Sequence, residues 1–112
     1  MRVVTIGVGS RQVIDARFVA AMSGEYQGEF ITFESVHLLL DTLTPTRWHI
    51  LIALSGRGPC YVVDVQEAVG RPLDEVCVDV KVLVERGVVD MDAQGRVEFP
   101  YEQILVGFEW RR

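Results

Sequence analysis

The sequence predicts an α+β fold, and this prediction rests on three patterns. Alternating stretches rich in valine or phenylalanine at residues 1–8 and 29–33 are typical of strands. Apolar residues at helical spacing fill four segments between residues 34 and 87, divided by glycine and proline. Residues 88–99 alternate around a turn that ends in Gly95, as in a hairpin. The last three helices followed by a hairpin give the order of a winged helix-turn-helix domain.

Two parts of the chain are predicted. Residues 1–33 form a strand–helix–strand extension, with the helix at 10–22 and Ser10 as its N-cap. Residues 34–112 form the winged helix-turn-helix domain with a C-terminal tail. A pair of strands this short is only marginally stable by itself, so the extension has to pack against the rest of the domain or against a second copy of the chain. We therefore expect residues 1–33 to be a dimerisation element.

The first two helices of the larger part are short. The segment "ESVHLLLDTL" (34–43) has Val36, Leu39, Leu40 and Leu43 on its apolar side. In "TPTRWHILIALSGRG" (44–58), Thr44 is the expected N-cap, and Pro45 occupies the first helical position. Its buried stripe is predicted to contain Trp48, Leu51 and Ile52.

The next two helices form the predicted helix-turn-helix. Gly70 ends a helix over residues 61–70, and Gly87 ends one over residues 71–87. The stretch "PYEQILVGFEW" (100–110) is apolar enough to pack as an extended tail or a short strand.

Composition narrows the class of protein. About half of the 112 residues are hydrophobic, which suits a globular domain, and no apolar run is long enough to span a bilayer. We expect a cytoplasmic location and no membrane contact. Residues 1–58 are neutral, whereas residues 59–112 hold six basic and eleven acidic side chains, so the net charge of −5 lies in the second half. The negative electrostatic field of this half opposes the phosphate contacts that supply most non-specific DNA affinity.

No enzyme or cofactor site is predicted. Cys60 and Cys77 with His37 and His49 lack the spacing of a metal site, so we expect no metal and two cysteines of core type. The histidines are expected to be structural. "GVGS" (7–10) begins like a dinucleotide loop, but Gln12 replaces its third glycine. No serine and histidine form a nucleophile and base motif.

Four stretches carry a family resemblance: "LTPTRWHILIAL", "VVDVQEAVGRPLDEVCVDVKVLVERGVVD", "GRV" and "FPY". Together they resemble small winged-helix transcriptional regulators of the MarR-like kind, including predicted antitoxin-type autoregulators of bacteria and archaea. The resemblance covers residues 30–101. It implies a cytoplasmic homodimer that binds double-stranded DNA, with the helix at 71–87 as the recognition helix and the hairpin tip over the minor groove or backbone. A toxin is the protein partner that it implies.

The basic residues that could contact DNA are few. They lie at helix ends, on the recognition helix and in the hairpin: Arg57, Arg71, Lys81, Arg86 and Arg96. Each could instead have a structural role. Arg86, for example, lies near a helix C-terminus, where a positive charge interacts favourably with the helix dipole.

The recognition helix departs from the family pattern. Cys77 stands where a small polar residue is usual, and Val78 where an arginine is frequent. With Val76, Val80, Leu83 and Val84 inward, the outward face holds three acids, one base and two valines. Such a face fits a protein partner or an inter-subunit contact unless the tail folds back over it. The candidate partner-binding residues are Asp74, Glu75, Val78 and Val82.

Two functions from different classes therefore remain open. The first is a homodimeric DNA-binding regulator. The second is a winged-helix interaction module whose acidic helix binds a basic protein, and the shared fold does not decide between them.

Overall fold

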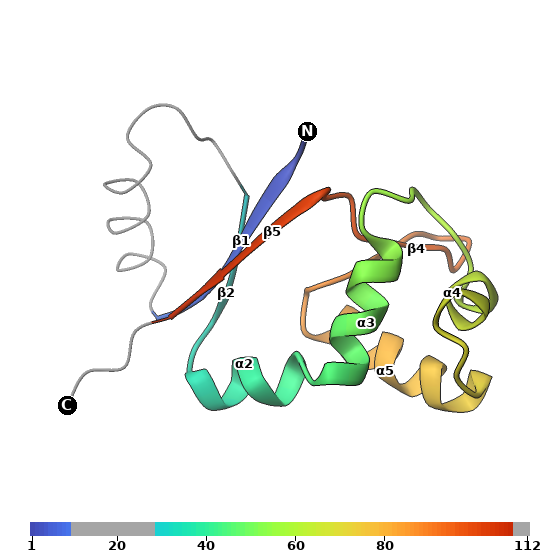
Figure 1. Ribbon diagram of the computed structural model, residues 1–112, viewed down its shortest axis with the longest axis horizontal. Coiled ribbons are helices and arrows are strands. Elements are labelled where there is room, and N and C mark those ends of the chain that lie inside the picture. The colour runs from blue at the N-terminus through green and yellow to red at the C-terminus, as the bar shows by residue number, and fades with distance from the viewer. Residues whose placement is uncertain (10–28, 109–112) are drawn as a thin grey trace.

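The computed structural model describes residues 1–9 and 29–108. The helix predicted at 10–22 and the last residues of the predicted tail lie outside these ranges. In chain order the elements are β1 (Val3–Val8), β2 (Glu29–Phe33), α2 (Val36–Thr42), α3 (Pro45–Leu54), α4 (Val62–Val69), α5 (Leu73–Glu85), β3 (Asp90–Met91), β4 (Val97–Glu98) and β5 (Gln103–Gly107). The predicted α+β class is confirmed, since four helices and short sheets make up this part of the chain (Figure 1).

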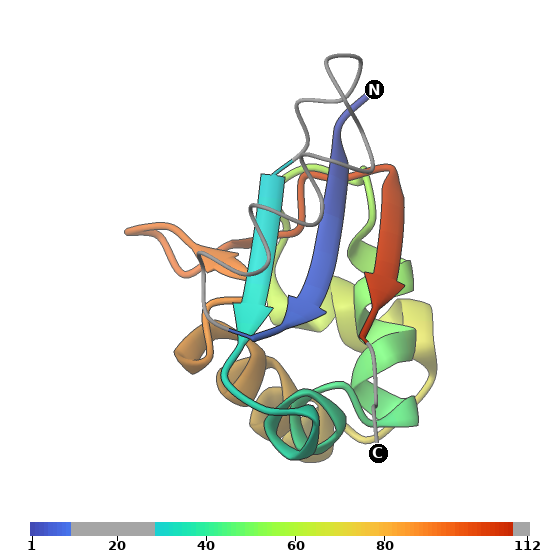
Figure 2. The ribbon, with the colours of Figure 1, turned by 90° about the vertical axis from the view of Figure 1, so that its left-hand side faces the viewer.

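The larger sheet has the strand order β2-β1-β5, and both of its pairings are parallel. Val4 lies opposite Glu29 on one side, and Val3 lies opposite Gln103 on the other. The tail that follows residue 100 therefore contains a strand. A short strand is one of the two forms predicted for this segment, the other being an extended tail. Figure 2 shows β1 between the two edge strands.

The predicted helix boundaries follow local signals. The Thr44 side chain accepts a hydrogen bond from the backbone N–H of Arg47, and Pro45 begins α3, as predicted. Gly70 ends α4 in the left-handed conformation (φ 70°). Helices α3, α4 and α5 pack against one another in pairs, whereas α2 packs against β1 and β2. The helical group thus lies beside the sheet, with α2 joining the two (Figure 1).

The hairpin is anchored to the helical group. Its strands β3 and β4 are antiparallel, with Met91 opposite Val97, and Gly95 takes the positive φ that its turn requires. Val97 also exchanges backbone hydrogen bonds with Cys60, in the loop before α4. One hairpin strand is therefore held between its partner strand and the α3–α4 loop.

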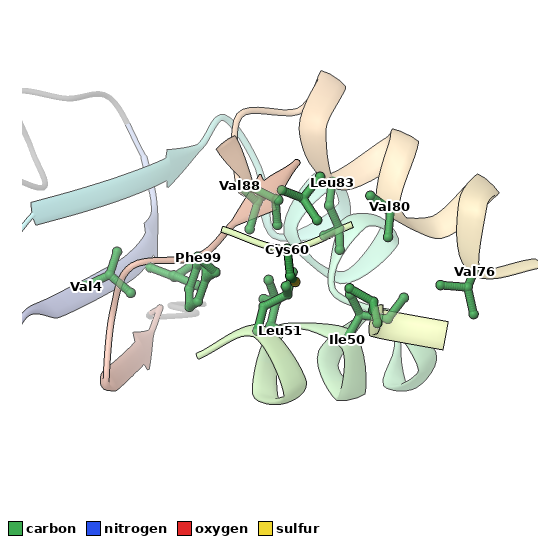
Figure 3. Packing of buried hydrophobic residues seen from close by; sticks show 14 of the residues in the cluster. Val4, Ile50, Leu51, Cys60, Val76, Val80, Leu83, Val88 and Phe99 are labelled. Atoms are coloured by element: carbon green, nitrogen blue, oxygen red, sulfur yellow. The ribbon is translucent and has the colours of Figure 1, made fainter. Parts of the chain in front are cut away.

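One continuous core joins the sheet to the helices. It includes Val4 and Ile6 from β1, Leu51 from α3 and Leu83 from α5. Figure 3 shows Phe99, the largest fully buried side chain among the described residues, between Val4 and the helical residues. The chain therefore passes through the core on its way from the hairpin to β5.

Several predicted core positions are wrong. Leu40 and Ile52 are more than half exposed, and Cys77 is also exposed, although Cys60 is buried as predicted. His37 and His49 lie at the surface. For Ile52 the reason is the rotation of α3, which buries Ile50 and Leu54 with Leu51, so its inward face is turned away from Ile52. In the described ranges no helix is long and apolar enough to cross a membrane.

We predict that Phe99→Ala lowers the free energy of unfolding by about 3–5 kcal/mol, because it leaves a cavity where the sheet meets the helices. Urea unfolding followed by circular dichroism measures the change. Val63→Ala on the exposed side of α4 is the control and should stay within about 0.5 kcal/mol of the parent. Equal losses in the two variants would contradict the central position of Phe99.

Candidate functional site

The candidate site is built on α4, α5 and the turn between them. At the start of α4, the Asp64 carboxylate accepts a hydrogen bond from the backbone N–H of Tyr61 at 2.9 Å. At its end, the Gln66 side chain donates to the carbonyl of Arg71 at 3.0 Å, across the turn. Asp74 and Glu75 lie in the first turn of α5, where the helix dipole favours negative charge. These local interactions fix the direction in which α5 leaves the turn.

A buried charge cluster sets the rotation of α5. Asp79 is only 8% exposed and accepts hydrogen bonds from two arginines. Arg47 Nε of α3 lies 3.1 Å from one carboxylate oxygen, and Arg71 Nη1 of the turn lies 2.9 Å from the other. A buried carboxylate needs such partners, because an uncompensated charge in the interior is strongly unfavourable. Asp79 therefore joins α3, the turn and α5.

Sequence reasoning missed Asp79 and Arg47. A signal for Asp79 was present: residues 76, 79, 80 and 83 share one helical face, and three of them are valine or leucine. An aspartate within an apolar stripe requires a buried partner. The identity of that partner comes from contacts 8 and 32 residues away in sequence, which helical spacing does not reveal.

The outward face of α5 largely matches the prediction. Val76, Val80 and Leu83 are buried and Val84 is half-buried against the core. The opposite side exposes Asp74, Glu75, Val78, Lys81 and Glu85, whereas Val82 is half-buried. Val78 is 61% exposed, so the part of the tail that the structure describes does not cover it. The result is an acidic face with one protruding valine.

The basic residues predicted to contact DNA differ in how strongly other residues of the chain bind them. Arg71 is committed to buried Asp79. Arg86 donates to the Asp41 carboxylate at 2.9 Å and to the Thr42 hydroxyl at 2.7 Å, and so ties the end of α5 to α2. Lys81 lies 4.0 Å from Glu85, with both side chains well exposed. Arg57 makes a long hydrogen bond, 3.5 Å, to the carbonyl of Asp64.

Arg96 belongs to the hairpin turn. Asp92 accepts hydrogen bonds from the backbone N–H groups of Gln94 and Arg96 and from Arg96 Nε at 2.7 Å. Desolvation acts to raise the pKa of Asp92, but these hydrogen bonds outweigh it and hold the pKa below its ordinary value. The stabilisation from Asp92 is therefore present above the unfolded pKa and is lost as pH falls through the lowered folded value.

Two hollows accompany this region. One lies between α3 and α4 and is mainly apolar, with His49, Ile52 and Ala53 on one side and Ala68 and Val69 on the other. A smaller one lies at the hairpin, and its lining contains three acids and Arg96.

The described residues contain no group of three or more histidine, cysteine or acidic side chains able to hold a metal ion. Cys60 lies in the core, where burial raises the pKa of its thiol. Its backbone contact with Val97 is structural.

The fold defined by this geometry is a mixed α+β domain with an anchored hairpin beside a helical group. The chain belongs to the HVO_A0114 family, whose model matches residues 42–106. This span contains α3, α4, α5, the hairpin and most of β5, and therefore the whole candidate site. No curated protein matches the chain.

We predict that Asp79→Asn destabilises the protein by roughly 2–3 kcal/mol, because it leaves Arg47 and Arg71 without a carboxylate in a mostly buried position. Asparagine has nearly the same shape as aspartate, so the loss of stability would come from the missing charge and not from a cavity. Asp74→Asn, on the exposed face, should change stability by less than about 1 kcal/mol. Denaturant unfolding compares the two. Equal stability of the variants would show that the charge cluster does not hold α5.

Proposed function

We propose that the protein is a winged-helix transcriptional regulator that binds double-stranded DNA as a homodimer in the cytoplasm. The observation that carries this proposal is the order and anchoring of the elements. Helices α3, α4 and α5 pack in pairs, and the hairpin that follows is fixed to the α3–α4 loop through Cys60 and Val97. In this proposal α5 is the recognition helix and the hairpin is the wing. The family resemblance of residues 30–101 supports an autorepressor of the antitoxin type.

The ion pairs that the candidate DNA-binding residues already make differ in how easily a phosphate could replace the carboxylate. Exposed pairs contribute about 0–1 kcal/mol, so a phosphate can replace the carboxylate that now holds Lys81 or Arg96. Arg86 is held more firmly, through Asp41 and the buried Thr42. Moving Arg71 to a phosphate would leave buried Asp79 with only one of its two arginines, so we assign Arg71 a structural role. Lys81, Arg57 and Arg96 are therefore the proposed DNA contacts.

A second candidate function is favoured by the outward face of α5. Val78 protrudes there between Asp74, Glu75 and Glu85, and Lys81 is its one basic neighbour on the helix. An apolar centre with an acidic rim suits a protein that presents an apolar side chain within basic ones. In this alternative the protein is an interaction module, and a basic toxin is one such partner.

We predict that binding to the gene's own upstream DNA weakens steeply with salt, by about 0.9 log unit per phosphate contact per decade of salt. Lys81→Ala should reduce that slope by about one contact. Arg2→Ala, which removes an exposed cation at the start of β1, is the control and should leave the slope unchanged. Fluorescence anisotropy of labelled duplex measures the affinities. Absence of binding at low salt would reject the regulator proposal.

One substitution gives opposite results for the two functions. We predict that Val78→Lys strengthens duplex binding, because it adds a cation to the face of α5 that approaches DNA. An interaction module would instead lose its basic partner, because the new charge repels it. Val63→Lys, at a comparably exposed position on α4, is the control. Weaker duplex binding by Val78→Lys than by Val63→Lys would contradict the proposed docking of α5.

A further inference from the structure

We infer that α5 selects DNA sites that contain cytosine and thymine. In this assignment the Asp74 carboxylate accepts a hydrogen bond from the amino group of the cytosine, and Val78 packs on the methyl group of the thymine. The assignment rests on the proposed binding of duplex DNA through α5 and adds the bases that α5 reads. The exposed cations supply affinity through phosphates, whereas Asp74 and Val78 determine specificity.

Four side chains form one row along the outermost line of α5. Val76, Val80 and Leu83 point into the core, as Figure 3 shows. With about 3.6 residues per turn, the row on the opposite side of the helix contains Asp74, Val78, Lys81 and Glu85, and all four are exposed. In a recognition helix the residues of the N-terminal part reach the base edges. Asp74 and Val78 therefore stand where bases are read.

The spacing of this row along the helix axis suits stacked base pairs. Each residue of a helix rises by about 1.5 Å, so Val78 lies about 6 Å beyond Asp74, and Lys81 lies about 4.5 Å beyond Val78. Successive base pairs of a duplex are about 3.4 Å apart. Each interval thus corresponds to between one and two base pairs, and the three side chains meet different base pairs.

The Asp74 carboxylate can only accept hydrogen bonds, and this limits the bases that it tolerates. In the major groove cytosine presents an amino donor, whereas guanine presents two acceptors and thymine presents one. Adenine places the acceptor N7 beside its amino group, so it fits a carboxylate less well than cytosine does. Asp74 therefore selects cytosine mainly by penalising the other bases.

Val78 has no group that forms a hydrogen bond, and its side chain is 61% exposed. Thymine carries a methyl group at its major-groove edge, which apolar side chains contact. Packing Val78 on this methyl group removes apolar surface of both partners from water. Thymine is therefore the base that this position favours.

Lys81 lies in the same row and favours a duplex over a basic protein as the partner. A basic protein surface would meet Lys81 as a repulsive charge. A duplex offers it phosphate oxygens and the acceptors of guanine. Its distance of 4.0 Å to the exposed Glu85 leaves it able to exchange partners.

Selection from a pool of random-sequence duplexes tests Asp74. The duplexes that the protein retains at low salt are amplified and sequenced. Asparagine pairs with N6 and N7 of adenine, so we expect Asp74→Asn to exchange cytosine for adenine at one position of the selected site and to keep the other positions. Glu67→Gln, which removes an exposed acid of α4, is the matched control and should retain cytosine. Cytosine selected equally by Asp74→Asn and the parent would overturn the inference.

Deoxyuridine in place of thymine tests Val78, because this replacement removes the methyl group alone. We expect one such replacement in the selected duplex to weaken binding by the parent about three- to fivefold, as measured by fluorescence anisotropy. Val78→Ser should bind the two duplexes with nearly equal affinity, whereas Val63→Ser, an exposed position on α4, should keep the difference. A parent that is indifferent to every replacement, or a Val78→Ser variant that keeps the difference, would overturn the inference.

The outcomes separate base selection from DNA binding itself. A pool from which no duplex is enriched at low salt would reject both the regulator and the selection of bases, and would favour the interaction module. Enriched duplexes in which neither Asp74 nor Val78 changes the preferred base would reject the selection alone and leave the regulator in place.

Discussion

The pairing of Asp79 with Arg47 and Arg71 is the constraint on which the presentation of α5 depends. A carboxylate at this depth has to face its two arginines, and the arginines come from α3 and from the turn before α5. Once Asp79 points inward, the helical period directs Asp74, Val78 and Lys81 away from the core. The same interaction that holds three segments together therefore determines which side chains any partner meets.

The two candidate functions differ in what they require of the ion pairs. A regulator needs cations that exchange a carboxylate for a phosphate, and exposed pairs such as Lys81–Glu85 permit this exchange at little cost. An interaction module needs the acidic face as it stands. Arg71 serves neither function directly, because its carboxylate partner is buried. Basic residues counted from the sequence alone therefore overstate the positive charge that α5 and its turn offer to DNA.

Sequence patterns predicted the elements that depend on local interactions. Thr44 with Pro45, Gly70 and Gly95 each act within a few residues of their own position, and all behave as predicted. Sequence patterns failed where contacts between segments far apart in the sequence determine the structure. Ile52 is exposed because packing turned α3, and the partners of Asp79 lie on other segments. The pairing of β5 with β1 is equally non-local, so the tail was predicted as a strand or extended segment without a neighbour.

That pairing has a consequence for how the chain folds. The backbone N–H of Arg2 donates to the carboxylate of Glu102, one hundred residues further along the chain, whereas α3, α4 and α5 find one another within about forty residues. Contacts that close long loops are slow to form, and local helical contacts form quickly. The sheet can be completed only after residues 103–107 have left the ribosome, so β1 gains its second neighbour about one hundred residues after it is itself synthesised.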